Sequence, residues 1–234
     1  MIKVYPSTSR YTADHGWLKS NFSFSFAEYF DPENMNFGPM RVLNDDFVKP
    51  HKGFGAHPHQ EMEIVSIVLD GYLKHEDSTG HTATTTFGGV QRMSAGTGIV
   101  HSEVNPSTTE DVNFLQLWFE PKKNSLTPSY EQTNFNIDEM KNKLLPVVKK
   151  NPSNNEVAHI NQNLTIYLSD LEKDHAITFT QKEGRRIFLF IIDGDVTIND
   201  ETALTKRDSV RITDTKALKI TTKLGSRFML IDLP

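Results

Sequence analysis

The chain has 234 residues, of which 37% are hydrophobic and 24% are charged, so it can bury a core as one large domain or two smaller ones. Its formal net charge of -5 is opposite in sign to that needed to bind a phosphate backbone, which argues against direct binding of nucleic acid. It contains no cysteine, so disulfides, thiolate ligands and a cysteine nucleophile are excluded. Histidine and carboxylate remain as ligands for a transition metal.

The N-terminal segment Met1–Ser7 lacks the basic region, apolar stretch and small-residue cleavage site of a secretory signal. No apolar run in the chain approaches the roughly 18 residues that a membrane helix requires. We therefore expect a cytoplasmic protein that does not associate with membranes.

Residues 1–52 contain short apolar segments separated by turn-forming residues. Phe22, Phe24 and Phe26 alternate with serines, and this period of two predicts a strand whose phenylalanines face the core. Asp31 and Pro32 then interrupt the pattern. The N-terminal part of the chain is therefore expected to be β-structure with loops.

Residues 63–69 are mostly apolar and β-branched, with such residues on both faces, which predicts a buried strand. Asp70 and Gly71 favour a hairpin turn, after which residues 72–77 would return antiparallel. Further strands are predicted at 82–87 and 112–119. Short strands at this spacing, with glycine at the turns, favour an antiparallel barrel or sandwich.

The character of the sequence changes between residues 121 and 155, where prolines punctuate polar sequence. One short helix is predicted there, from Ile137 to about Leu145. We interpret this stretch as the connection between two halves, an N-terminal domain at 1–133 and a C-terminal domain at 134–234.

The second half repeats the plan of the first, with an apolar strand followed by Asp193, Gly194 and a return strand. Aligning Gly194 with Gly71 sets three residues of the second half against three of the first, namely Thr180, Lys182 and Arg186 against His57, His59 and Glu63. None of these three is a good ligand for a transition metal. The second half is therefore expected to be a copy that lacks a metal site.

Two short patterns carry ligand-type side chains, His57-Pro58-His59 and His101-Ser102-Glu103. On an extended strand, residues two apart point to the same side. If neighbouring strands bring the two pairs together, three imidazoles and one carboxylate converge, and such a set binds a metal. Glycines flank both pairs and permit tight turns and close backbone approach.

These motifs resemble those of the pirin family of the cupin superfamily. The resemblance is dense from Gly16 to about Trp118 and thin beyond, and it rests on five segments: 41–46, 55–59, 75–78, 90–98 and 101–105. It implies an all-β bicupin, with two antiparallel β-barrels of the jelly-roll type that face each other and a short helical linker. It also implies that only the N-terminal barrel carries a metal.

The resemblance implies that the metal ligands are His57, His59, His101 and Glu103, and that the ion is one divalent transition metal. Iron(II) is expected, with manganese, nickel, copper and zinc as alternatives. Cupins in general more often take the carboxylate from the first motif, at the position of Glu63. Glu63 is therefore the alternative ligand, or a partner that orients a ligand histidine.

Four protein ligands on an octahedral metal leave two positions open, which favours chemistry or sensing. Some pirin-like proteins have quercetin 2,3-dioxygenase activity, and the resemblance implies a dioxygenase that opens the ring of a flavonol-like aromatic substrate with O2. Glu103 or Glu63 would take the substrate proton. The alternative is a non-catalytic, redox-sensing regulator that acts through a protein partner. We expect a monomer.

The other six histidines have no second ligand at a suitable spacing and are predicted to be surface or structural residues: His15, His51, His75, His81, His159 and His175.

Overall fold

The computed structural model describes all 234 residues and consists of β-strands apart from two short 3-10 helices, as the sequence predicts for an all-β chain. Its contacts divide it into two compact units. The N-terminal unit comprises Tyr11–Asn134 and Lys150–Gln162, and the C-terminal unit comprises Met1–Arg10, Phe135–Lys149 and Asn163–Pro234. A single cut after residue 133 therefore does not separate the two units. The first ten residues pack with the C-terminal unit, and Lys150–Gln162 packs with the N-terminal unit.

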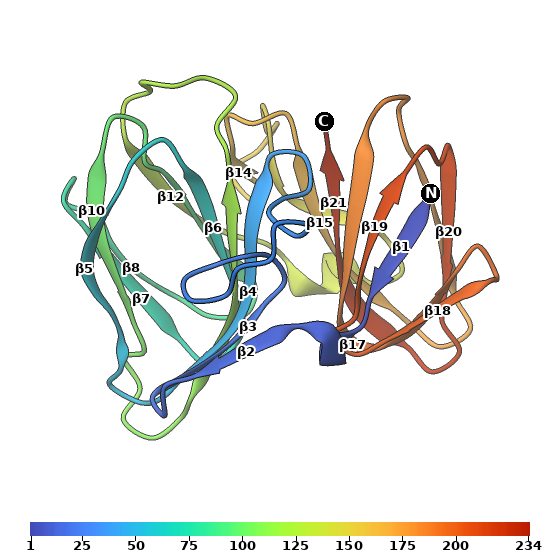
Figure 1. Cartoon of the computed structure of the whole chain (residues 1–234), viewed down its shortest axis with the longest axis horizontal. Helices are drawn as coiled ribbons and strands as arrows, with labels where there is room; N and C mark the ends of the chain where they lie inside the picture. The colour runs from blue at the N-terminus through green and yellow to red at the C-terminus, as the bar shows by residue number, and fades with distance from the viewer. The chain divides into compact units, whose positions relative to one another are not determined.

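The N-terminal unit is built from two antiparallel sheets. Its strands are β2 (Tyr11–Asp14), β3 (Leu18–Phe22), β4 (Met40–Val48), β5 (Gly53–His59), β6 (Glu63–Asp70), β7 (Leu73–Asp77), β8 (Thr82–Thr85), β9 (Gly89–Ser94), β10 (Ile99–Val104), β11 (Val112–Phe119), β12 (Ser129–Asn134) and β14 (Ala158–His159). One sheet has the order β12-β9-β6-β11-β4-β3-β2, and the other has the order β5-β10-β7-β8; β14 belongs to neither. Within this unit the two sheets face each other (Figure 1).

The interior of the N-terminal unit is not apolar throughout. On β6, the side chains of Ile64, Ser66 and Val68 share one face, and Ile64 and Val68 belong to two different apolar clusters. Ser66 lies between them in a row of polar residues that crosses the sheet from β9 to β4. This polar row consists of Gln91, Ser66, Gln116 and Asn44, all buried. Because buried polar groups require partners, the row marks the part of the interior where a site can form.

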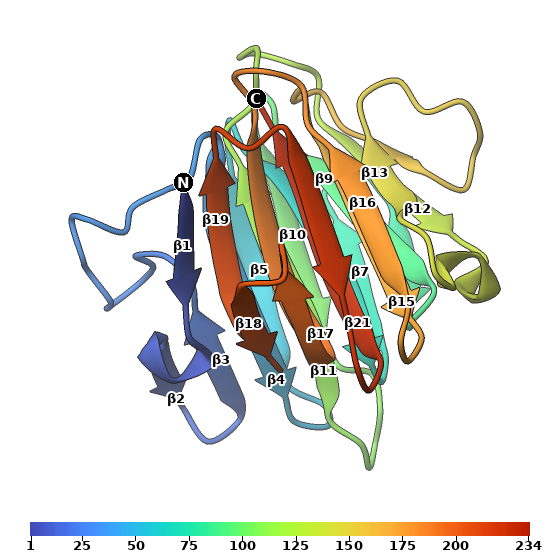
Figure 2. The ribbon, with the colours of Figure 1, turned by 90° about the vertical axis from the view of Figure 1, so that its right-hand side faces the viewer.

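The interior of the C-terminal unit is one continuous apolar cluster, which includes Ile187, Leu189 and Ile191 of β17. The strands are β1 (Ile2–Tyr5), β13 (Leu145–Lys149), β15 (Thr165–Leu171), β16 (Ala176–Thr180), β17 (Arg186–Ile198), β18 (Thr202–Thr205), β19 (Ser209–Thr213), β20 (Ala217–Thr221) and β21 (Ser226–Leu233). β1 pairs with β19 at the edge of the main sheet (Figure 2). Thr180 and Lys182, which align with the first two histidines, are exposed.

The predicted hairpin at Asp70 and Gly71 is wrong, because β6 and β7 belong to different sheets and β7 pairs with β8 and β10. Gly71 instead carries the chain across a corner, with φ of 77°, and a Cβ there would lie 2.6 Å from the backbone oxygen of Asp111. Gly194 has φ of 78° at the point where β17 changes partner from β21 to β18. Each half thus has a corner at its aligned glycine, and neither has a hairpin there.

The predicted helix from Ile137 to about Leu145 is shorter than expected. A 3-10 helix spans Ile137–Met140, and the Asn136 side chain accepts a hydrogen bond from the backbone N–H of Asp138. Asn142 has φ of 55°, which ends any helical continuation, and Leu145 already begins β13. The other 3-10 helix is Ser7–Ser9. Neither of them has the length and apolar character that a membrane-spanning helix needs.

Candidate metal centre

The two ligand-bearing strands are direct neighbours. β10 pairs antiparallel with β5, and His101 lies opposite His57. The register shifts between His101 and Glu103, where β5 has one residue more than β10 and bulges. Gly53 allows the close approach of the two backbones, because a Cβ there would lie 2.3 Å from the carbonyl oxygen of Glu103. This pairing brings the two sequence motifs together.

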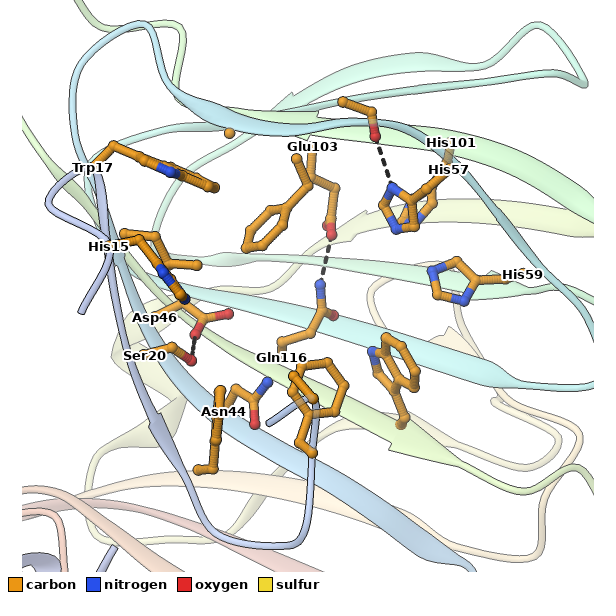
Figure 3. A pocket seen from close by; sticks show the side chains of 18 of the residues that line it. His15, Trp17, Ser20, Asn44, Asp46, His57, His59, His101, Glu103 and Gln116 are labelled. Atoms are coloured by element: carbon orange, nitrogen blue, oxygen red, sulfur yellow. Dashed lines mark hydrogen bonds between the residues drawn. The ribbon is translucent and has the colours of Figure 1, made fainter. Parts of the chain in front are cut away.

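The imidazoles of His57, His59 and His101 converge, as predicted. Each offers a ring nitrogen, and these three atoms all lie within 4.8 Å of one another. Nε2 of His101 lies 3.1 Å from Nε2 of His57. Figure 3 shows the three rings together on one side of the cavity. His101 is buried, whereas the other two are half-buried, so the cluster can be reached from the cavity.

Contacts of the ring nitrogens indicate which of them are free to bind an ion. Nδ1 of His57 lies 2.7 Å from the carbonyl oxygen of Gly55, and a carbonyl only accepts, so this nitrogen carries the proton. The lone pair of His57 is therefore on Nε2. Nε2 of His59 is buried and has no hydrogen-bond partner in the protein. A metal ion at the cluster would satisfy that nitrogen.

A chain of hydrogen bonds fixes the orientation of His101. Nε2 of His75 lies 2.9 Å from Oδ2 of Asp77. Burial alone would raise the pKa of Asp77, but hydrogen bonds from Thr79, His75 and His81 outweigh it and lower the pKa to about 2. The ionised carboxylate only accepts, so Nε2 of His75 is the donor, and in the neutral ring Nδ1 is then an acceptor. Nδ1 of His101 lies 3.4 Å from that atom and donates to it. The lone pair of His101 is thereby directed to the cluster from Nε2.

The imidazoles of His59 and His101 are held in the neutral form that metal ligands need. Burial, together with the neighbouring His57, lowers the pKa of His59 to about 4. Burial, with the other imidazoles, lowers the pKa of His101 to about 3. Neutral imidazoles that present lone pairs to a common point suit a transition metal, and the cluster is a site for one such ion.

Glu103 lies beside the cluster but outside the set of atoms within 4.8 Å. Its carboxylate accepts hydrogen bonds from Oγ of Ser66 at 2.7 Å and from Nε2 of Gln116 at 2.5 Å. The Ser66 hydroxyl also lies 3.0 Å from Oε1 of Gln116. Glu103 is 3% exposed, and its burial raises the pKa of the carboxyl although these hydrogen bonds oppose the shift.

Glu63 is not among the side chains that line the cavity. Its Oε1 accepts from the Ser94 hydroxyl at 2.9 Å and from the backbone N–H of Asn161 at 2.8 Å. The side-chain amide of Asn161 also donates to Oε1, and the backbone N–H of Gln162 donates to Oε2 at 2.7 Å. This carboxylate therefore holds the segment Lys150–Gln162 against β6.

The cluster opens into a cavity of about 510 Å³ in the N-terminal unit. Aromatic side chains form much of its wall: Trp17, Phe22, Phe26, Phe54 and Trp118. The sequence predicted that Phe22 and Phe26 face the core from one strand, but β3 ends at Phe22 and both rings line the cavity. The ring of Trp118 meets the ring of His59 edge-on, with centroids 4.8 Å apart. The cavity thus offers flat apolar walls next to a metal site.

Sequence reasoning missed the part that His75 plays. Predicted to be a surface or structural residue, it is 2% exposed and lies between Asp77 and His101. The signal was the same period of two that revealed the ligand pairs, since His75 and Asp77 point to one side of β7. His15 also lines the cavity, near its aromatic wall.

Comparison with known proteins agrees with this geometry. Residues 5–119 match the family described as Pirin, and residues 147–233 match the family described as Quercetinase C-terminal cupin domain. The chain is 40% identical to "Quercetin 2,3-dioxygenase" of Escherichia coli K12 over 234 residues, which are 100% of this chain and 99% of that protein.

Two crystal structures of YhhW from Escherichia coli have the same fold. One is 38% identical, with a TM-score of 0.95, and covers 100% of this chain and 98% of that one. The other is described as the bacterial pirin YhhW in complex with nickel(II); it is 38% identical, with a TM-score of 0.94, and covers 100% of this chain and 99% of that one. With its histidine cluster, its two cupin domains and relatives matched over their full length, the chain belongs to the pirin family.

Proposed function

We propose that this protein is an iron-dependent dioxygenase that opens the heterocyclic ring of a flavonol with O2. The observation that carries the proposal is the position of the three imidazoles at one side of an aromatic cavity, with the carboxylate of Glu103 beside them. The name of the relative from Escherichia coli K12 supports quercetin as a substrate to test.

The cavity suits a flat aromatic substrate. Phe22, Phe26 and Trp118 offer apolar faces and edges for packing against fused rings. The volume of about 510 Å³ lies within the range of small-molecule sites. A bound iron(II) ion would supply a Lewis acid that lowers the pKa of a coordinated hydroxyl of the substrate. The walls would hold that hydroxyl at the histidine side of the cavity and exclude water from it.

We propose that Glu103 supplies the carboxylate of the metal site and takes the proton of the substrate hydroxyl. The Ser66 hydroxyl has one hydrogen and two acceptors in reach, Oε1 of Glu103 at 2.7 Å and Oε1 of Gln116 at 3.0 Å. While Glu103 is ionised, Ser66 donates to it. When Glu103 takes a proton at Oε1, it can donate to Ser66, which turns its own hydrogen to Gln116. The network therefore accepts both protonation states of Glu103 without losing a hydrogen bond.

The proposal that the ion is iron(II) rests on the family resemblance. Imidazole nitrogens also suit nickel, copper and zinc, and the YhhW structure described above is a nickel(II) complex. Elemental analysis of protein purified without added metal would identify the ion. Iron at about one equivalent per chain is the expected result, and protein filled with another of these metals would contradict it.

The test of the proposed reaction is O2 uptake by iron-loaded protein supplied with quercetin. Wild type should consume one O2 and release one carbon monoxide per quercetin. His101→Ala should lose bound metal and activity together, because it removes the buried imidazole of the cluster. His175→Ala, which removes an exposed histidine of the C-terminal unit, is the control and should match wild type. Iron-loaded wild type that leaves quercetin unchanged would overturn the proposal.

A further inference from the structure

The cavity has a second polar region, on strands β3 and β4. Asn44 and Asp46 are two apart on β4 and so point to the same side, and Ser20 lies opposite Asp46 on β3. All three line the cavity and are buried. Figure 3 shows them on the side of the cavity away from the histidines. We call Ser20, Asn44 and Asp46 the hydroxyl subsite.

The hydroxyl subsite has hydrogen-bonding capacity that the protein does not use. Asn44 ends the polar row, and its Oδ1 is buried without a partner, whereas Ser66 and Gln116 in the same row are bonded to Glu103. Asp46 accepts from the hydroxyl of Ser20 through Oδ1, and its Oδ2 has no donor in the protein. Buried polar atoms without partners are costly, so a ligand that supplies partners gains affinity here.

The chemistry of the subsite selects a hydroxyl group. Asn44 offers both an acceptor and a donor, and Asp46 offers a free carboxyl oxygen, which together match a group that donates and accepts one hydrogen bond. Burial raises the pKa of Asp46 to about 7; the neighbouring Asp45 and Glu103 also raise it, against the Ser20 hydrogen bond, so near neutral pH the carboxyl can donate as well. An anion would meet Asp46 and Glu103 and is disfavoured. Phe22 and Phe26 line the same cavity and fit an aromatic carrier.

We propose that Ser20, Asn44 and Asp46 bind a phenolic hydroxyl on a substrate ring that lies away from the metal. This inference rests on the proposed flavonol function and adds the selection among flavonols. It also gives a role to the segment Arg41–Asp46, which resembles the family motif but contributes nothing to the metal cluster.

The test compares two flavonols that share the 3-hydroxyl: quercetin, which carries four more hydroxyls, and 3-hydroxyflavone, which carries none. Their dissociation constants are measured with nickel-loaded protein under nitrogen, so that no O2 reaction intervenes. Wild type should prefer quercetin by about tenfold or more, because an unmet buried polar group penalises the analogue that lacks the hydroxyl. Asn44→Leu and Asp46→Leu should each reduce that preference to less than threefold, mainly by weakening quercetin binding.

Asn21→Leu is the matched control, because Asn21 is on β3 next to Ser20 but does not line the cavity. It should keep the wild-type preference, and so should the conservative variant Asp46→Asn, within threefold. Bound nickel and thermal unfolding show whether each variant is folded. Wild type that binds both flavonols equally, or an unchanged preference in folded Asn44→Leu, would overturn the subsite alone. Wild type that binds neither flavonol would overturn the proposed function and the subsite with it.

Discussion

Nδ1 of His101 lies 3.4 Å from Nδ1 of His75, so only one of these two nitrogens can carry a hydrogen in the contact. Asp77 decides which one, because its ionised Oδ2 accepts from Nε2 of His75 at 2.9 Å. The consequence is a lone pair on the nitrogen of His101 that faces the other two imidazoles. The carboxylate of Asp77, which bonds to His75 and not to the histidine cluster, thus determines which nitrogen of His101 carries the proton.

This relationship predicts that Asp77→Asn weakens metal binding. Oδ1 of the new amide would still accept from the backbone N–H groups of Thr79 and His81, so its NH2 group would face His75. His75 would then donate from Nδ1, and the proton of His101 would move to Nε2, the ligand nitrogen. We expect a loss of metal affinity of about 10- to 100-fold, measured by competition with a chelator.

The control for that substitution is Glu76→Gln, the same chemical change at an exposed position one residue earlier on β7. It should leave the metal affinity within twofold of wild type. Equal affinities in folded Asp77→Asn and wild type would refute the role assigned to the His75 contact.

Ser66→Ala is predicted to slow the reaction without loss of metal. The alanine removes the hydroxyl that can donate to either Glu103 or Gln116, so proton uptake by Glu103 would lose its compensating hydrogen bond. We expect kcat with quercetin to fall by about tenfold, which is less than the roughly 100-fold that loss of a general base costs, because Glu103 itself remains. Ser94→Ala, which removes the hydroxyl that bonds the other buried carboxylate, should keep kcat near wild type. Similar kcat values in both variants would argue against the proton role.

The two carboxylates considered from the sequence should respond differently to amide substitution. Glu103→Gln should lower kcat by about 100-fold or more, because a neutral amide cannot take the proton. Glu63→Gln should keep activity but lose roughly 2 kcal/mol of unfolding free energy, since a charged acceptor of hydrogen bonds from Asn161 and Gln162 is lost. Urea unfolding and kcat on the same preparations distinguish the two roles. Loss of activity in a stable Glu63→Gln protein would contradict the assignment.

The stability of the metal-free protein should depend on pH through Asp46. Its pKa is raised to about 7 in the folded state from an ordinary value of 3.8, mainly by burial. The folded state holds this proton more tightly, so the contribution to stability is complete below about pH 4 and is lost as pH rises through 7. Asp46→Asn should therefore gain stability over wild type between pH 5 and pH 8, by about 2 to 4 kcal/mol at most. A difference in unfolding free energy that stays constant across this range would contradict the prediction.

Residue type and strand period were enough to predict the metal cluster. His57, His59 and His101 are scarce ligand types at a spacing that fixes their side, and only the pairing of β5 with β10 had to be supplied by the fold. The corner at Gly71 was not predictable in the same way. A positive φ marks a turn, but the choice between a hairpin and a change of sheet depends on which strands the next segment meets.

Contacts between distant segments account for what the sequence did not show. Ser66, Gln116 and Glu103 come from three strands, and nothing local in any of them announces a shared hydrogen bond. Glu63 follows the first motif as a ligand would, and only the return of Asn161 to its carboxylate reveals its other task. Local patterns therefore located the histidine cluster, whereas the hydrogen bonds around it depended on tertiary pairing.

The central claim is that these three histidines hold one transition metal ion. It is tested most directly by the metal content per chain of wild type and of the double variant His57→Ala/His101→Ala, with His51→Ala/His175→Ala as the control that removes two exposed histidines. We predict about one equivalent in wild type and control, and less than a tenth of that in the first double variant. A folded His57→Ala/His101→Ala protein that retains its full complement of metal would contradict the account.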